Sequence, residues 1–127
     1  MGMDVHGINP NALEGRCFRR HIFRWPPLWQ YCCDVSKEAR GVENGYSNDG
    51  DGLDEAKTLV LAATLRAHLA NGHTAAYCEG RDSALAELPD EQPPRCINKV
   101  PMLSRLTDQD VREFAEFLEH CGGFAID

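Results

Sequence analysis

The most regular apolar pattern in the chain follows an Asn-, Asp- and Gly-rich loop. Apolar residues recur there at intervals of three and four, without internal Gly or Pro, which predicts a helix over residues 53–71. Asp51 is its expected N-cap, Asp54 completes a capping-box-like pair, and Gly72 is the expected C-terminal stop. The broad stripe predicts a central, largely buried helix. Its expected inner face comprises Leu53, Ala56, Leu59, Val60, Ala63 and Ala67, widened by Leu61, Leu65 and Leu69.

Two shorter segments also have helical patterns. Because proline is tolerated in the first turn of a helix, a short helix is predicted over residues 27–37. Another is predicted over residues 74–88, capped by Thr74 and ended by Pro89. The expected inward residues are Leu28, Tyr31, Cys32 and Val35 in the first of these helices, and Tyr77, Cys78, Leu85 and Leu88 in the second.

The last predicted helix begins at Thr107. Thr107 and Asp110 have the spacing of a capping box, and Gly122 and Gly123 end the helix. Residues 124–126 then alternate like a short strand or a docking tail. The helix should bury one clean face, formed by Val111, Phe114, Ala115, Leu118 and Cys121.

The remaining segments are expected to be less regular. Residues 1–24 contain four Gly or Pro residues and are predicted to be irregular or weakly extended, and residues 89–106 form a Pro-rich connector. We therefore predict one globular domain over residues 1–127. Its fold is mainly α, or α+β with minor β, with three or four helices around the helix at 53–71. A small β element would join the two ends of the chain.

Composition narrows the functional classes. The 127 residues carry a net charge of −7, which argues against a general nucleic-acid binder, because phosphate contact needs a basic face. No apolar run has the length of a membrane span, and no signal peptide is visible at the N-terminus. We expect no membrane association, and a cytoplasmic protein whose six cysteines are reduced. The charge is uneven, since residues 1–40 hold six Lys/Arg against four Asp/Glu.

The segment 16–31 mixes basic and aromatic residues, which are the types that dominate interface hot spots. It is a candidate surface for a protein partner. Two alternatives remain open. The tryptophans would cap the core over Leu65 and Phe114 while the arginines pair with acidic residues, or the segment would bind single-stranded nucleic acid by stacking and charge. The candidate partner-binding residues are Arg19, Arg20, Arg24, Trp25 and Trp29.

The loop at 48–52 has the sequence NDGDG, which is similar to the start of a calcium-binding loop. The glutamate that would complete the coordination is absent, because Thr58 stands at its position. We therefore predict no metal and no cofactor. The loop is either a turn that leads into the next helix or part of a small-ligand site. Candidate ligand-binding residues are Tyr46, Asn48, Asp49, Asp51 and His73.

No catalytic motif is recognisable. The sequence lacks C-x-x-C, H-E-x-x-H, a P-loop, a dinucleotide-binding glycine motif and a nucleophile elbow. His120 and Cys121 are adjacent on a predicted helix, and such side chains diverge by about 100°. These observations favour a protein that is not an enzyme.

Four motifs occur in order along nearly the whole chain: MGMDVHG at 1–7, WPPLWQYC at 25–32, NDGDG at 48–52 and VREFAEF at 111–117, which continues to GGF at 122–124. Together they resemble a family of small uncharacterised bacterial and phage-borne proteins. Members of that family usually carry two C-x-x-C pairs between the second and last helices, similar to a zinc-binding insertion. Here that region is shortened and only Cys96 remains. The resemblance therefore implies a helical body that acts without zinc.

Taken with the missing catalytic motifs, the resemblance predicts a small, acidic, cytosolic protein-interaction module, phage-encoded and inhibiting a host protein. Its expected partner is a protein. One alternative is a small-ligand- or metal-binding protein or enzyme that uses the loop at 48–52. The other is single-stranded nucleic-acid binding by the segment 16–31, which ranks last because of the net charge of −7.

Overall fold

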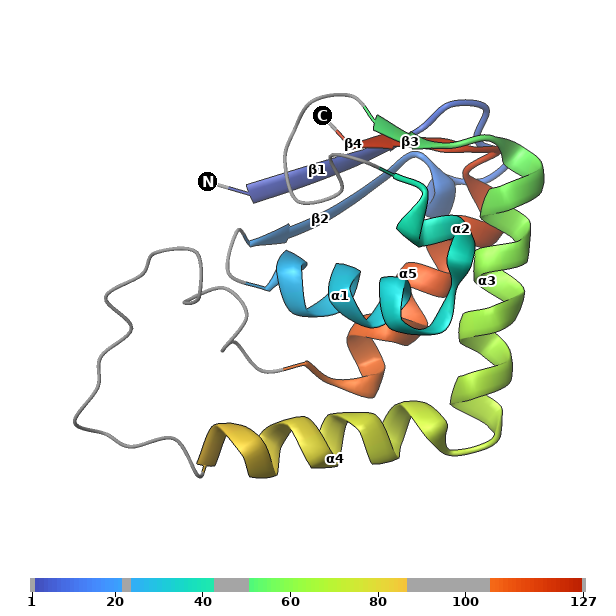
Figure 1. Ribbon diagram of the computed structural model, residues 1–127. Helices are drawn as coiled ribbons and strands as arrows, with labels where there is room; N and C mark the ends of the chain where they lie inside the picture. The colour runs from blue at the N-terminus through green and yellow to red at the C-terminus, as the bar shows by residue number, and fades with distance from the viewer. Residues whose placement is uncertain (1, 22–23, 43–50, 87–105, 127) are drawn as a thin grey trace.

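The computed structural model describes residues 2–21, 24–42, 51–86 and 106–126 (Figure 1). In this part of the chain, an antiparallel sheet is covered on one face by helices. Its strands run in the order β2-β1-β4-β3, so the C-terminal strand joins β1 to β3. The α+β class and the predicted strand at 124–126 are thereby confirmed. The strands are β1 (Gly2–Gly7), β2 (Cys17–His21), β3 (Asp51–Leu53) and β4 (Phe124–Ile126).

The N-terminal region is more regular than predicted. Strands β1 and β2 form an antiparallel pair, separated by a single 3-10 turn (Leu13–Gly15). Met3 and Val5 are buried and alternate with polar residues, which is the pattern of a half-buried strand. Gly7 does not break the strand. It allows a close chain crossing, since a Cβ there would lie 1.9 Å from the Gly15 carbonyl oxygen.

The helices begin and end close to the predicted positions. The helix predicted over 27–37 begins at Trp25, and a second short helix follows it. Prolines 26 and 27 occupy its first turn, where the missing amide hydrogens have no helical partner. The helices are α1 (Trp25–Val35), α2 (Lys37–Arg40), α3 (Glu55–Ala70), α4 (His73–Ala86) and α5 (Asp108–His120).

Two predicted N-caps are wrong and one is confirmed. Asp51 belongs to β3, and Asp54 caps α3 by accepting a hydrogen bond from the Lys57 amide at 2.9 Å. Thr74 lies inside α4 and is fully buried. At α5, Thr107 and Asp110 form the predicted capping box. Gly72 lies after α3 with φ +85°, as predicted for a helix stop.

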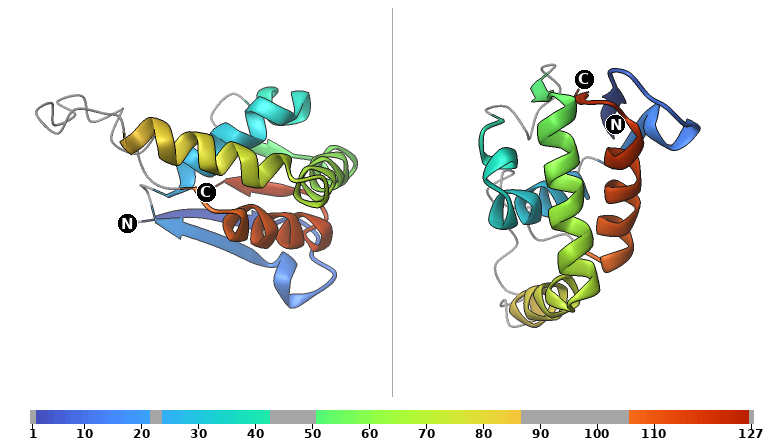
Figure 2. Two further views of the ribbon diagram at one scale, coloured as in Figure 1. Left: turned by 90° about the horizontal axis from the view of Figure 1, so that it is seen from below. Right: turned by 90° about the vertical axis from the view of Figure 1, so that its right-hand side faces the viewer.

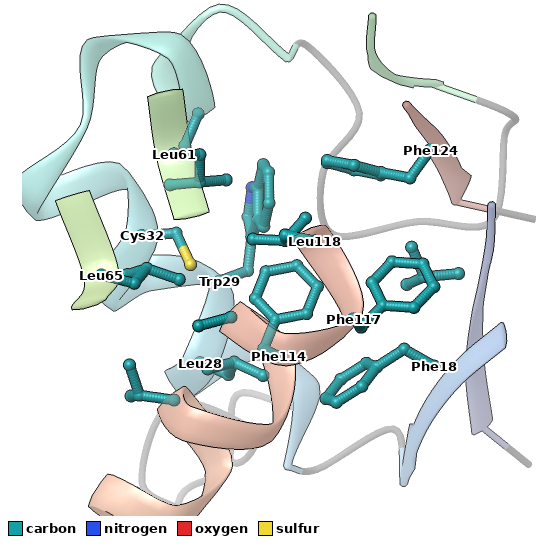
Figure 3. Packing of buried hydrophobic residues seen from close by; sticks show 14 of the residues in the cluster. Phe18, Leu28, Trp29, Cys32, Leu61, Leu65, Phe114, Phe117, Leu118 and Phe124 are labelled. Atoms are coloured by element: carbon teal, nitrogen blue, oxygen red, sulfur yellow. The ribbon is translucent and has the colours of Figure 1, made fainter. Parts of the chain in front are cut away.

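The core lies between the inner face of the sheet and helices α1, α3 and α5 (Figure 3). It is rich in aromatic rings. Phe18 of β2 lies 4.9 Å from Phe114 of α5 between ring centroids, and Trp25 meets Phe114 edge-on at 5.5 Å. The predicted inward face of α5 is confirmed, because Val111, Phe114, Ala115, Leu118 and Cys121 are all buried.

Helix α3 contacts each of the other four helices, but its predicted inner face is wrong. The residues that it buries are Thr58, Leu61, Ala62 and Leu65. Leu59 and Val60, which were expected in the core, are 47% and 49% exposed. The helix has apolar residues on two opposite sides, and the neighbouring helices cover only one of them.

Candidate functional site

The basic and aromatic segment does not display its tryptophans. Trp25 and Trp29 are 0% and 1% exposed, and their rings stack at 5.5 Å. They cannot contact a partner while the fold is intact, so their assignment to a partner surface is wrong. The alternative interpretation, in which both indoles complete the core, is the one that the structure supports.

The nearby arginines face carboxylates. Arg24 Nη2 donates to both oxygens of Asp110 at 2.8 Å, and Arg20 Nε donates to the same side chain at 3.2 Å. Arg20 also pairs with Glu113. Asp110 is only 5% exposed, so this network ties β2 and the start of α1 to the N-terminus of α5. On the outer face of the sheet, Arg19 forms an exposed pair with Asp4 at 3.1 Å.

The predicted ligand-binding residues do not come together. Tyr46, Asn48 and Asp49 lie outside the described residues. Asp51 pairs with Ile126 in the sheet, whereas His73 begins α4. Because α3 separates the two and 16 residues of helix span about 24 Å, Asp51 and His73 lie at opposite ends of that helix (Figure 1). A single pocket lined by both of them is therefore wrong.

A cavity of about 480 Å³ lies between α2, β3 and the beginning of α3. Its charged lining is mixed, with two lysines and two carboxylates. One of these carboxylates, that of Asp54, already caps α3. The lining residues are Lys37, Glu38, Gly41, Gly52, Leu53, Asp54 and Lys57.

A polar cluster holds the corner between α3 and α4. The Tyr31 hydroxyl lies 2.8 Å from Thr74 Oγ1 and 3.1 Å from His73 Nδ1. The ring of His73 packs against that of His68, with centroids 4.4 Å apart. Burial raises the pKa of Tyr31, and burial together with His73 lowers the pKa of His68. Tyr31 is fully buried, so the cluster positions α4 rather than presenting a reactive hydroxyl.

The exposed side of α3 carries Leu59 and Val60, two of the four large hydrophobic residues that are exposed in the described part of the chain. Its members lie within one stripe of the helix, opposite the buried Leu61 and Leu65. In the right-hand view of Figure 2, α3 lies in front, and no other described element crosses it. We call this stripe the outer face of α3. It comprises Ala56, Leu59, Val60, Ala63, Ala67 and Ala70, all of them exposed.

The sequence shows the apolar spacing of this face but does not show whether the face is buried or exposed. All members of this face except Ala70 were predicted to point into the core, because they have helical spacing. The residues that do point inward, Leu61 and Leu65, were treated as an extension of that stripe. A helix that is apolar on both sides, but covered on only one, exposes an apolar surface.

Among the residues that the structure describes, no group of three or more His, Cys, Asp or Glu side chains is arranged to hold a metal ion. None of the helices described is long and apolar enough to cross a bilayer. Comparisons of the chain with protein-family models, with curated proteins and with solved structures found no match.

Proposed function

We propose that this protein is a non-enzymatic interaction module that binds another polypeptide chain along the outer face of α3. The observation that carries the proposal is the exposure of Leu59 and Val60, each about half accessible, on a face whose other members are all alanine. Burying such a stripe against a partner is favourable by about 25 cal/mol for each Å² of apolar surface. A continuous exposed apolar surface of this kind is typical of a binding site.

The shape of the surrounding structure supports this proposal. Helix α3 runs without interruption from Glu55 to Ala70, and α4 runs away from it after the corner (Figure 1). The resemblance to phage-borne proteins favours a host protein in the cytosol as the target of the module.

The test compares the chains that an immobilised bait retains from a cell lysate supplemented with purified, untagged copies of this protein. The wild-type bait should retain at least one chain that a Leu59→Lys/Val60→Lys bait loses. The matched control is Ala75→Lys/Ala76→Lys, which places the same two charges on adjacent exposed positions of α4. If all three baits retain the same chains, the outer face of α3 is not the binding surface.

The cavity beside β3 favours a second candidate function, the binding of a small polar ligand. Its volume of about 480 Å³ is within the usual range for ligand sites, and Lys37 and Lys57 supply positive charge. A ligand at 100 times its Kd stabilises the folded state by about 2.7 kcal/mol. A thermal-shift panel of carboxylates and phosphates should then raise Tm in the wild type but not in Lys37→Ala/Lys57→Ala. No shift with any compound would exclude this function.

A further inference from the structure

We propose that the packed imidazoles of His68 and His73 form an acid-sensitive contact, which holds α4 in place at neutral pH and releases it when both rings carry a proton. The proposal goes beyond the partner surface, because it concerns the C-terminal end of α3 and the helix that follows it. Three observations carry it: how α4 is attached, what the ring nitrogens contact, and which charged groups surround the two rings.

Helix α4 is attached through one side of its first turns. Within residues 73–80, Thr74 and Cys78 are buried, whereas Ala75, Ala76 and Glu79 are exposed. Beyond the corner, α4 runs away from α3 (Figure 1). The contacts at the corner therefore determine whether α4 keeps its position relative to the core.

The ring of His73 can accept a proton without breaking the corner. Its Nδ1 lies 3.1 Å from the Tyr31 hydroxyl, which in turn lies 2.8 Å from Thr74 Oγ1. When Nδ1 carries no proton, the hydroxyl of Tyr31 can donate to it and accept from Thr74. When Nδ1 carries a proton, both hydrogen bonds can reverse, with Nδ1 donating to Tyr31 and Tyr31 donating to Thr74. One proton on the two rings is therefore compatible with the closed corner.

A second proton, on His68, is not compatible with it. The Nδ1 atom of His68 is buried and has no hydrogen-bond partner in the described part of the chain. Because a protonated imidazole donates from both nitrogens, the second proton would leave a buried N–H group without an acceptor. The ring centroids of His68 and His73 are 4.4 Å apart, so the two positive charges would also repel each other. In agreement, burial and the nearby His73 lower the pKa of His68.

No carboxylate in the described residues forms an ion pair with either ring, so none compensates the second charge. On α1, the carboxylate of Asp34 accepts a hydrogen bond from the Tyr77 hydroxyl at 2.8 Å. Charged side chains of α3 and α5 are paired elsewhere: Arg66 with Glu119, Arg112 with Asp108, and Asp110 with Arg20 and Arg24.

Acid should therefore open the corner. Once α4 moves away, the ring of His68 is hydrated again and takes up a proton at a higher pH than in the closed corner. The stability that the contact gives to α4 is complete above the open-state pKa of about 6.5, and it is lost as the pH falls through the lowered pKa of the closed state. The opening is local, with Gly72 as the hinge, because its φ of +85° already marks the change of direction.

The first experiment measures hydrogen exchange by NMR, residue by residue, at about pH 7.5 and pH 5. Protection is expressed relative to an unstructured chain at the same pH, which removes the intrinsic pH dependence of exchange. In the wild type, protection of the α4 amides should fall by about threefold to tenfold at the lower pH, whereas that of the α5 amides should hold. In His68→Gln, the protection of α4 should not fall.

The matched control is His120→Gln. His120 lies at the C-terminal end of α5, where its Nδ1 is 3.0 Å from Asn11 Oδ1, so this variant removes a histidine without touching the corner. Its α4 should lose protection in acid as the wild type does. The proposal is overturned if α4 protection does not depend on pH in the wild type, if His68→Gln loses as much as the wild type, or if α4 and α5 lose protection together.

The second experiment follows the imidazole signals of His68 by NMR during a pH titration. Its midpoint should lie below about 6.5 in the wild type. His73→Gln should raise the midpoint, because it removes the neighbouring positive charge, and His120→Gln should leave it unchanged. A purely structural role of His73 would not move the midpoint. An unchanged midpoint in a folded His73→Gln variant would therefore contradict the proposed coupling of the two rings.

Discussion

Helices α3 and α5 pack against each other but divide their surfaces differently. Helix α5 has one buried apolar face, and its opposite side carries charged residues such as Glu113 and Glu116, which face water. Helix α3 buries Leu61 and Leu65 and presents Leu59 and Val60 to solvent. The core accounts for the whole pattern of α5 but only half of the pattern of α3. The remaining apolar stripe is not covered within the described chain, and it is the surface that we propose for a partner.

The largest effect that this comparison predicts is at the centre of the α5 face. Phe114→Ala removes a fully buried ring that packs against Phe18 and Trp25. It should lower the free energy of unfolding by about 3–5 kcal/mol, because the cavity that remains cannot collapse fully. Urea denaturation followed by circular dichroism measures the change. A loss below about 1 kcal/mol would contradict the central place of α5 in the core.

The second prediction compares the two sides of α3 directly. Leu65→Ala, on the buried side, should lower the free energy of unfolding by about 2–5 kcal/mol. Leu59→Ala, on the outer face, should change it by less than about 0.5 kcal/mol at concentrations where the protein is monomeric. The two variants have the same chemistry and serve as controls for each other. Equal losses would mean that α3 is buried on both sides.

The third prediction concerns how α5 begins. Thr107→Ala removes the hydroxyl that accepts a hydrogen bond from the Asp110 amide at 3.2 Å and donates to its carboxylate at 3.0 Å. We expect a loss of about 1 kcal/mol in chemical denaturation. Thr107→Ser keeps the cap and is the matched control. If both variants lose the same free energy of unfolding, the threonine methyl group contributes to stability and the cap does not.

The smallest effect should be a pH dependence that comes from the α3–α4 corner. His68 has a lowered pKa in the folded state, so the unfolded chain takes up its proton at higher pH. The contribution of His68 to stability is complete above its unfolded pKa of about 6.5 and is lost as the pH falls through the lowered folded pKa. Melting curves between about pH 7.5 and 5 should show a smaller fall in Tm for His68→Gln than for the wild type. Parallel curves would contradict this contribution.

The sequence predicts those parts of the fold that local rules decide. The Thr107 cap, the buried face of α5 and the strand at 124–126 follow from spacing alone. Strand β1 was missed because its two apolar residues, Met3 and Val5, form too short an alternation between glycines. The inner side of α3 could not be chosen from a helix that is apolar on both sides. In each missed case, the deciding contact comes from a distant segment.

The candidate sites depended even more on distant contacts. Composition alone could not distinguish Trp25 and Trp29 as core residues from the same residues as surface anchors, because both roles favour large aromatic rings. Asp110 pairs with Arg20 and Arg24, which precede it in the chain by 90 and 86 positions. Nothing local predicts that pairing. The outer face of α3 was visible as a pattern, but only the fold shows which side is covered.

The central position of β4 has a consequence for how the molecule is made. In the described sheet, strands β1 and β3 do not pair with each other, and β4 bridges them. During synthesis on the ribosome, both earlier strands leave with a free edge and remain so until Phe124, Ala125 and Ile126 have emerged. A nascent chain that stops short of these three residues would therefore expose the unpaired strand edges of β1 and β3, which a quality-control protease or chaperone could recognise.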